Sequence, residues 1–204
     1  MSPPDTTADP TDSDACARFA AGLYRIEQRA LKDGDSGARA LLARLRRALS
    51  RRGVEPTALA EVGDLLPWTG GEPLADDVLD TYLLVAALYA VRASGSGESR
   101  GASEGASFGT AANWLQKELN QGKRDRRHPG LDLRFGALLD ARREDLPYRL
   151  RQIVSMMAAH PVGLRTDQLL YDLLRWDAPG RAVQRRWARD YWTGSRSTPT
   201  PTDR

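Results

Sequence analysis

The sequence predicts an all-α protein, built from two small helical bundles that are joined by a flexible Ser/Gly-rich loop. Three observations favour this class. Apolar residues recur at intervals of three and four through most of the chain, as they do on one face of an amphipathic helix. No segment alternates apolar and polar residues over a sustained length, and β-branched residues are scarce. Strands are therefore not expected.

The first bundle is expected between residues 15 and 93. Its predicted helices are residues 15–32, 36–52 and 76–92, with a short one between Pro56 and Pro67. Asp14 is the expected N-cap of the first helix, and Gly34 is its expected stop. The last of these helices is strongly apolar, which predicts that it lies at the centre of the bundle.

The second bundle is expected between residues 108 and 193. Its predicted helices are residues 109–121, 131–142, 146–160, 165–175 and 182–192. Residues 94–107 read SGSGESRGASEGAS and hold no large apolar side chain, so they are expected to form the flexible loop between the bundles. Residues 1–14 and 194–204 are rich in Pro, Thr and Asp or Ser, and we expect a disordered leader and a disordered tail.

The composition favours a cytoplasmic protein without a membrane partner. No apolar run is long enough to cross a bilayer, and the N-terminus has no secretory signal. Cys16 is the only cysteine, so no internal disulfide can form, which fits a reducing compartment. The net charge is +3, and arginine supplies 27 of the 30 basic residues. A GC-rich genome also favours arginine, so the placement of the arginines carries more weight than their number.

One arginine row stands out in the second predicted helix. Arg44, Arg47 and Arg51 project from one side, opposite a stripe of leucines. No acidic residue follows Asp35 in this helix. Because like charges repel on a helix surface, an uncompensated row predicts an anionic partner such as a nucleic-acid backbone.

A second basic cluster lies further along the chain and is more mixed in charge. Its candidate nucleic-acid contacts are Lys123, Arg124, Arg126, Arg127, Arg142, Arg143, Arg149 and Arg151. Five acids dilute this stretch, so some of the arginines are expected to form structural ion pairs. The loop group at 123–127 is the favoured phosphate contact, because a loop adapts to a backbone. Trp176 and Trp187 have core-like spacing and are expected to pack inside.

The sequence gives no sign of catalysis or of a cofactor. His128 and His160 are far apart, and no neighbouring residues complete a metal site around either of them. Cys16 has no histidine near it in sequence and lies beside the expected disordered leader. Gly122-Lys123 lacks the rest of a phosphate-binding loop. We therefore expect a protein that binds partners and does not catalyse a reaction.

The order of motifs in the second half resembles a known family. Ser107-Phe108-Gly109-Thr110-Ala111 opens the half, LRQIV follows at 150–154, DQLLYDLLRW at 167–176 and WARDYW at 187–192. Their order and spacing resemble CasB, the small subunit of the type I-E CRISPR surveillance complex Cascade. The resemblance covers about residues 15 to 193.

This resemblance implies a two-bundle helical fold without catalytic activity. Its implied partners are crRNA, both strands of the target DNA in the R-loop, other Cascade subunits and a second copy of the chain. Arg44, Arg47 and Arg51 lie in the matching first-bundle region, and Arg142, Arg143, Arg149 and Arg151 match the second. An alternative stays open, in which the chain is a helical scaffold whose basic faces dock acidic protein partners.

Overall fold

The computed structural model describes residues 9–50, 53–68, 73–95, 106–120 and 127–193. Every regular element in these ranges is a helix, apart from one isolated β-bridge between Leu49 and Val54. The all-α prediction is confirmed.

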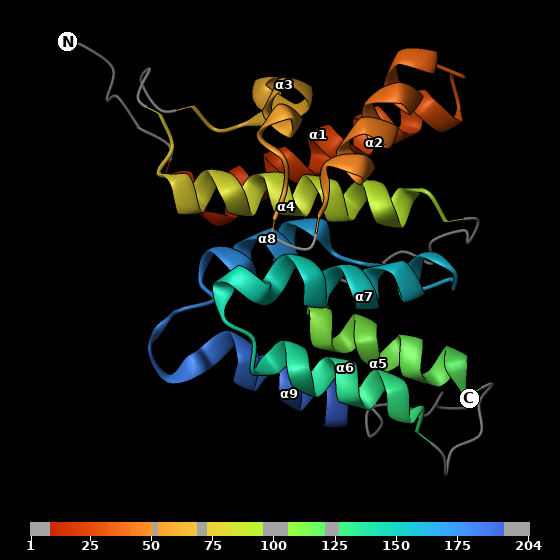
Figure 1. The fold of residues 1–204 in the computed structure, drawn as a ribbon, viewed down its shortest axis with the longest axis vertical. Helices are drawn as coiled ribbons and strands as arrows, with labels where there is room; N and C mark the ends of the chain where they lie inside the picture. Colours follow the sequence, from red (N-terminus) through yellow and green to blue (C-terminus); the bar gives the residue numbers. More distant parts are fainter. Residues whose placement is uncertain (1–8, 51–52, 69–72, 96–105, 121–126, 194–204) are drawn as a thin grey trace, which may run out of the picture.

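The elements form two stacked groups (Figure 1). The first half holds α1 (Ser13–Leu31), α2 (Ser36–Ala48), α3 (Leu59–Val62) and α4 (Asp76–Ala93), and short 3-10 turns flank α3. The second half holds α5 (Phe108–Leu119), α6 (Pro129–Leu139), α7 (Leu146–Ala158), α8 (Thr166–Leu174) and α9 (Ala182–Thr193). In Figure 1, α7 and α8 lie against α4, and α5, α6 and α9 form the far side.

Helix α4 is the centre of the whole molecule. It is buried on all sides from Thr81 to Leu88. Helices α1 and α2 pack on one side of it, and α7 and α8 pack on the other. One continuous hydrophobic core therefore runs through both bundles. The sequence predicted that α4 lies at the centre of the first bundle. In the structure, helices α7 and α8 of the second bundle pack on α4 as well.

The start of α1 differs from the prediction. Asp12, not Asp14, is the N-cap, and its carboxylate accepts a hydrogen bond from the amide of Ala15 at 2.6 Å. The Asp14 assignment is wrong because the helix already begins at Ser13.

Residues 9–12, assigned by sequence to the disordered leader, contact the folded protein. Tyr82 donates a hydrogen bond to the carbonyl of Pro10 at 2.6 Å. Arg175 donates one to the carbonyl of Thr11 at 2.9 Å. The remainder of the expected leader, residues 1–8, and the expected tail, 194–204, lie outside the described residues.

Helix α2 ends at Ala48, four residues before the predicted end. Leu49 is extended, with ψ at 107°, and it bridges Val54 as the chain doubles back. Gly53 has a φ of 145°, which an L side chain rarely adopts. Arg51, which the sequence placed in this helix, lies outside the described residues.

Most of the predicted loop, residues 96–105, lies outside the described residues, but both of its ends pack on the protein. A Cβ on Gly95 would stand 1.8 Å from the carbonyl oxygen of Ala158. Ser107 is buried, and its hydroxyl accepts from the amide of Thr110 at 3.3 Å as the N-cap of α5. Residues at both ends of the predicted loop therefore serve as caps or packing contacts of the helices.

Helices α5 and α9 cross closely around Trp187. The carbonyl oxygen of Trp187 lies 2.2 Å from the place where a Cβ on Gly109 would stand. The rings of Phe108 and Trp176 pack on the Trp187 indole, with centroids 4.9 and 5.2 Å away. Both tryptophans that the sequence placed in the core are buried there.

The α5–α9 crossing gives a direct test. Gly109→Ala should destabilise the protein by about 1–3 kcal/mol, because the added methyl overlaps backbone. Gly136→Ala is the matched control: a Cβ there meets nothing within 4 Å, and alanine favours a helix by up to about 1 kcal/mol. Urea unfolding followed by circular dichroism measures both. Equal free energies of unfolding for the two variants would show that the crossing is looser than described.

Candidate nucleic-acid interface

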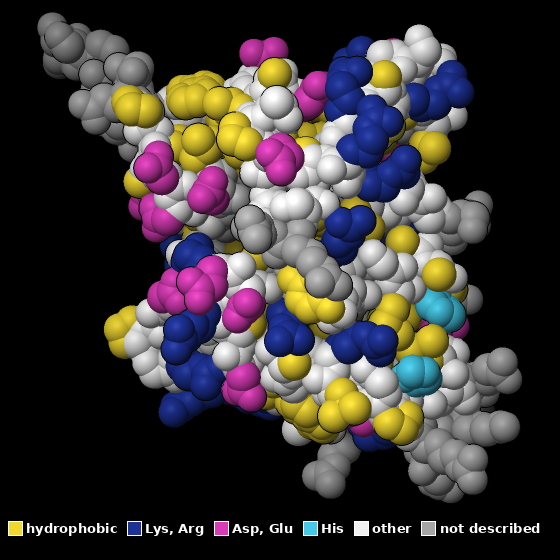
Figure 2. Space-filling view, in the orientation of Figure 1, with side chains coloured by type: hydrophobic (Ala, Val, Ile, Leu, Met, Phe, Trp, Pro, Cys, Tyr) yellow, Lys and Arg dark blue, Asp and Glu magenta, His cyan; other side chains and the backbone are white. Residues whose placement is uncertain are grey.

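Helix α2 carries a basic surface. Its inward side buries Ala38, Leu45 and Ala48, and arginines occupy the exposed positions. These arginines are Arg39, Arg44, Arg46 and Arg47. Figure 2 shows Lys and Arg side chains gathered over α2, with further ones over α7 and toward α6. The position of this surface follows from amphipathicity, because the core side of α2 fixes which residues face solvent.

The sequence predicted that Arg44 has no acidic partner, but in the structure it pairs with an acid. Its guanidinium makes a two-point contact with Glu61 of α3: Nη2 donates to Oε2 at 2.8 Å, and Nε donates to Oε1. The hydrogen bonds from Arg44 hold the pKa of the Glu61 carboxyl below its ordinary value. The prediction that the row is uncompensated is wrong for Arg44, because the compensating acid comes from another helix.

Arg46 and Arg47 provide accessible charge in the last turn of α2. Both are exposed, and within the described residues neither forms an ion pair. Arg47 and Arg44 line a shallow groove of about 270 Å³, together with Glu55 and Glu61. Arg46 is not among the contacts that the sequence predicted. Sequence alone does not show where Glu61 lies. In the structure it pairs with Arg44 and not with Arg46 or Arg47.

Arg143 of the second basic cluster is a structural residue. Its Nε donates to Asp177 at 2.6 Å, Nη1 donates to the Thr81 hydroxyl at 3.1 Å and Nη2 donates to the carbonyl of Leu173 at 3.2 Å. These partners lie on α4, at the end of α8 and after it. Arg143 therefore joins the two bundles rather than facing a ligand.

Arg151 and Arg127 are also held by protein groups. Arg151 Nη1 donates to the carbonyl of Leu49 at 2.6 Å, which satisfies a free carbonyl just past the end of α2. Arg127 pairs with Asp132 at 2.9 Å, and its guanidinium lies 4.7 Å from the centre of the Tyr191 ring. The Arg127–Asp132 pair is a structural ion pair of the kind that was expected in this cluster, and the sequence did not predict the contact of Arg151 with a carbonyl.

Arg142 and Arg149 remain open to solvent or to a ligand. The Arg142 side chain is 86% exposed, and its Nη1 atom lies 4.0 Å from the Glu144 carboxylate, too far for a hydrogen bond. Arg149 is half-buried, with its guanidinium 5.6 Å from the centre of the Tyr148 ring. Lys123, Arg124 and Arg126, the favoured loop group, lie outside the described residues.

The acidic side chains gather elsewhere. Asp76, Asp77 and Asp80 begin α4 and, with Glu144, line a cavity of about 500 Å³. In Figure 2, a group of Asp and Glu side chains lies on the side of this face away from α2, and a few others lie beside the Lys and Arg side chains over α2. This separation of charge favours an anionic ligand on the α2 side.

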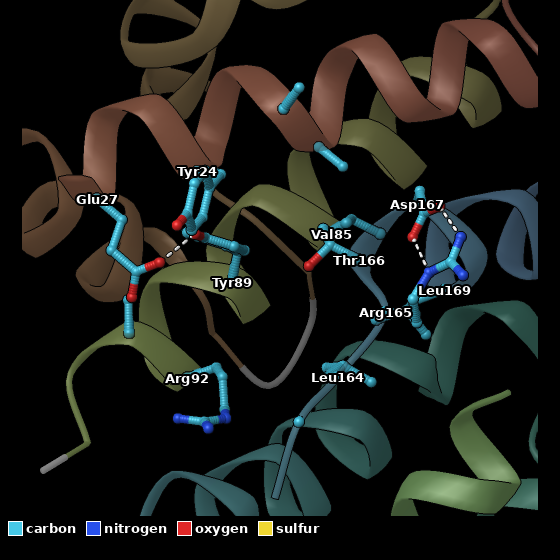
Figure 3. Close-up of a pocket in the computed structure, with 14 residues that line it drawn as sticks. Tyr24, Glu27, Val85, Tyr89, Arg92, Leu164, Arg165, Thr166, Asp167 and Leu169 are labelled. Carbon is cyan, nitrogen blue, oxygen red and sulfur yellow. Dashed lines mark hydrogen bonds and ion pairs between the residues drawn. The ribbon is translucent and has the colours of Figure 1, made fainter. Parts of the chain in front are cut away.

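A second cavity, of about 370 Å³, lies between α1, α4 and the start of α8 (Figure 3). The Tyr89 hydroxyl donates to Glu27, and Arg165 pairs with Asp167. Arg92 donates to the carbonyl of Val162 from Nε at 3.1 Å and from Nη2 at 2.9 Å. Each of these charged groups is matched by a protein partner, so the cavity belongs to the joint between the bundles.

The structure offers no further chemical centre in the part of the chain that it describes. No three side chains of the types that bind metals come together there. His128 acts as a helix cap, because its Nδ1 accepts from the amide of Leu131 at 3.2 Å. None of the described helices combines the length and apolar character needed to cross a bilayer.

Comparison with known families identifies the family to which this two-bundle protein belongs. The model of the family described as CRISPR-associated protein Cse2 matches residues 41–192. The chain belongs to the Cse2 family. The matched range begins within α2 and reaches the end of α9, so it includes the basic surface of α2 and the described part of the second bundle.

Individual relatives agree with this assignment. The CRISPR-associated protein Cse2 of Thermus thermophilus is 37% identical over 113 residues, which cover 55% of this chain and 56% of that protein. The match thus spans just over half of that relative's length. The crystal structure of CasB from Thermus thermophilus has a TM-score of 0.63 at 31% identity, covering 87% of this chain and 97% of that one. The CasB resemblance seen in the sequence is confirmed.

A more distant structure shares the fold alone. A chain of a structure described as a CRISPR RNA-guided surveillance complex is 18% identical to this one, with a TM-score of 0.60. The match covers 88% of this chain and 93% of that chain.

The different roles of Arg142 and Arg143 can be tested in adjacent residues. Arg143→Ala should cost about 2 kcal/mol of stability, because it removes charge-assisted bonds to Asp177, Thr81 and a carbonyl. Arg142→Ala should change stability by less than about 0.5 kcal/mol, since its side chain is exposed. Thermal unfolding measures both. A loss of stability in Arg142→Ala as large as that in Arg143→Ala would contradict the assignment.

Proposed function

We propose that this chain is the non-catalytic small subunit of a type I-E CRISPR surveillance complex, Cascade. In this role it binds crRNA and both strands of target DNA beside the other Cascade subunits and a second copy of itself, and stabilises the R-loop. Cse2-family membership supports the proposal, as does the 31% identity to CasB over most of the chain. The fold shared with a chain of a CRISPR RNA-guided surveillance complex fits a place in such an assembly.

The observation that carries the binding function is the exposed charge of Arg46 and Arg47 on α2, which no acid in the described parts of the chain neutralises. A guanidinium binds phosphate through two parallel hydrogen bonds and is weakly hydrated, so it suits a backbone contact. Two adjacent arginines of this kind lower the energy of a polyanion on this surface.

A path for the backbone leads from α2 to the second bundle. The contact of Arg151 with Leu49 places α7 beside the end of α2. Arg149 lies two residues before Arg151, and Arg142 precedes the helix. A strand that passes over α2 can therefore reach Arg142 and Arg149 of the second cluster. No base-reading geometry is needed, because pairing between guide and target reads the sequence.

Charge reversal on α2 tests the proposal. The double variant Arg46→Glu and Arg47→Glu should weaken binding of single-stranded DNA and RNA by about tenfold or more, equal to about 1.4 kcal/mol. It should also reduce the slope of log affinity against log salt by about one for each phosphate that the variant no longer neutralises. Fluorescence anisotropy of labelled oligonucleotides across a salt series measures both quantities.

The control is a reversal of the same charge elsewhere. Arg18→Glu with Arg25→Glu, on α1, changes the net charge by the same amount. It should leave nucleic-acid affinity within about twofold of wild type, because distant exposed charges are screened. Equal losses from the two pairs would show that net charge, not the α2 surface, controls binding. Absence of binding even at low salt, together with capture of an acidic partner protein, would favour the scaffold alternative.

Breaking the Arg44–Glu61 pair should strengthen nucleic-acid binding, whereas charge reversal on α2 should weaken it. Glu61→Gln should strengthen nucleic-acid binding by about two- to fivefold, because it releases Arg44 and removes a negative charge beside Arg47. Stability should fall by less than about 1 kcal/mol, since Arg44 is half exposed and the pair is solvent-screened. The matched variant is Glu55→Gln, on the same groove, which removes an acid without freeing an arginine. A larger gain in Glu55→Gln would show that Arg44 does not contact the ligand.

A further inference from the structure

An exposed tryptophan lies apart from the basic surface. The Trp68 residue is 48% exposed, just after the 3-10 turn that follows α3. It borders a groove of about 540 Å³ whose apolar wall is Leu65, Leu66 and Pro67. Figure 2 shows hydrophobic side chains gathered beside α3, away from the Lys and Arg side chains over α2. Trp68 is not among the residues to which the sequence gave a role.

Two hydrogen bonds fix Trp68. Its indole N–H donates to the carbonyl of Gly63 at 2.7 Å, and its amide donates to the carbonyl of Leu66 at 2.9 Å. The turn itself is wedged against α1, because a Cβ on Gly22 would stand 2.7 Å from the Leu65 side chain. The ring is therefore oriented before any partner arrives, and its polar atom is already satisfied. Such a residue loses little conformational entropy on binding, which is the property of an interface anchor.

The rim of the groove is positively charged. Arg18 and Arg25 come from α1, seven residues apart and on one side of the helix, and Asp64 is the acid opposite them. Both arginines are exposed, and in the described part of the chain neither is in an ion pair. An apolar wall with a cationic rim complements an apolar side chain that is flanked by carboxylates.

We propose that the Trp68 groove is a docking site for another protein, which inserts an apolar side chain between Trp68 and Leu65 and places acidic residues against Arg18 and Arg25. A protein fits this groove better than a nucleic acid. The wall is apolar, and the cations that line it among the described residues are two arginines beside one acid. Tryptophan and arginine are also the residues that most often anchor protein interfaces.

The choice of probe rests on the proposed function, since the other subunits of a Cascade complex are then the partners to test. Each subunit is purified, immobilised singly and titrated with the full-length chain by biolayer interferometry. Trp68→Ala, and separately Arg18→Glu with Arg25→Glu, should each weaken binding to the same subunit by about tenfold or more. Both variants should keep wild-type circular dichroism and nucleic-acid affinity within about twofold of wild type.

Trp192→Ala is the matched control. Trp192 is 46% exposed, close to the value for Trp68, but it lies at the end of α9 on the other bundle. Its removal should change subunit affinity by less than about twofold. The charge-reversal pair does not alter the apolar wall, so it tests the site even if Trp68→Ala fails to fold.

Three results would overturn the inference. If the wild-type chain binds a subunit and both groove variants bind it equally well, the docking site is wrong and the proposed function stands. If the wild-type chain binds no subunit, the docking site and the proposed membership of the assembly both fail. If Trp68→Ala lowers affinity for single-stranded DNA and leaves subunit binding unchanged, the groove is a stacking surface for nucleic acid.

Discussion

The structure depends on α4, a helix with no polar side in its central part. A helix that is apolar all round is stable in water only when other elements cover every face. Helices α1 and α2 of the first bundle and α7 and α8 of the second do this here. The consequence is that neither half of the chain can bury its own central helix alone. The two bundles are therefore one cooperative body, although a Ser/Gly-rich stretch separates them in sequence.

Arginine secures the joint between the bundles. Arg92 of α4 binds the carbonyl of Val162, Arg151 of α7 binds that of Leu49, and Arg175 after α8 binds that of Thr11. Each contact joins segments that are far apart in sequence, and each satisfies a carbonyl that its own helix or turn leaves free. A guanidinium suits this task because it has five donors on a long stem and costs less to desolvate than an ammonium. Part of the arginine content thus has a structural use that codon usage does not explain.

The same rigid body orients three different surfaces. The α2 side is basic, the start of α4 is acidic, and the end of α3 presents a fixed tryptophan in an apolar groove. This separation fits the two proposed contacts, a polyanion on the α2 side and a protein partner at the Trp68 groove, because the two would not compete for one surface. The Arg44–Glu61 ion pair lowers the net charge of the α2 surface, because it neutralises one arginine. Arg46 and Arg47 remain exposed.

The order of residues along the chain is enough to predict the helical class and nearly every helix, because the spacing of leucines and alanines is a local property of each segment. Periodicity and motif order also predict the family and the burial of Trp176 and Trp187. They do not predict which arginines are free. Glu61 is 17 residues from Arg44, Thr81 is 62 from Arg143, and Leu49 is 102 from Arg151. Only the folded chain brings such partners within hydrogen-bond distance. Whether a charge is open to a ligand is a property of the packed molecule, and in this protein that packing is centred on α4.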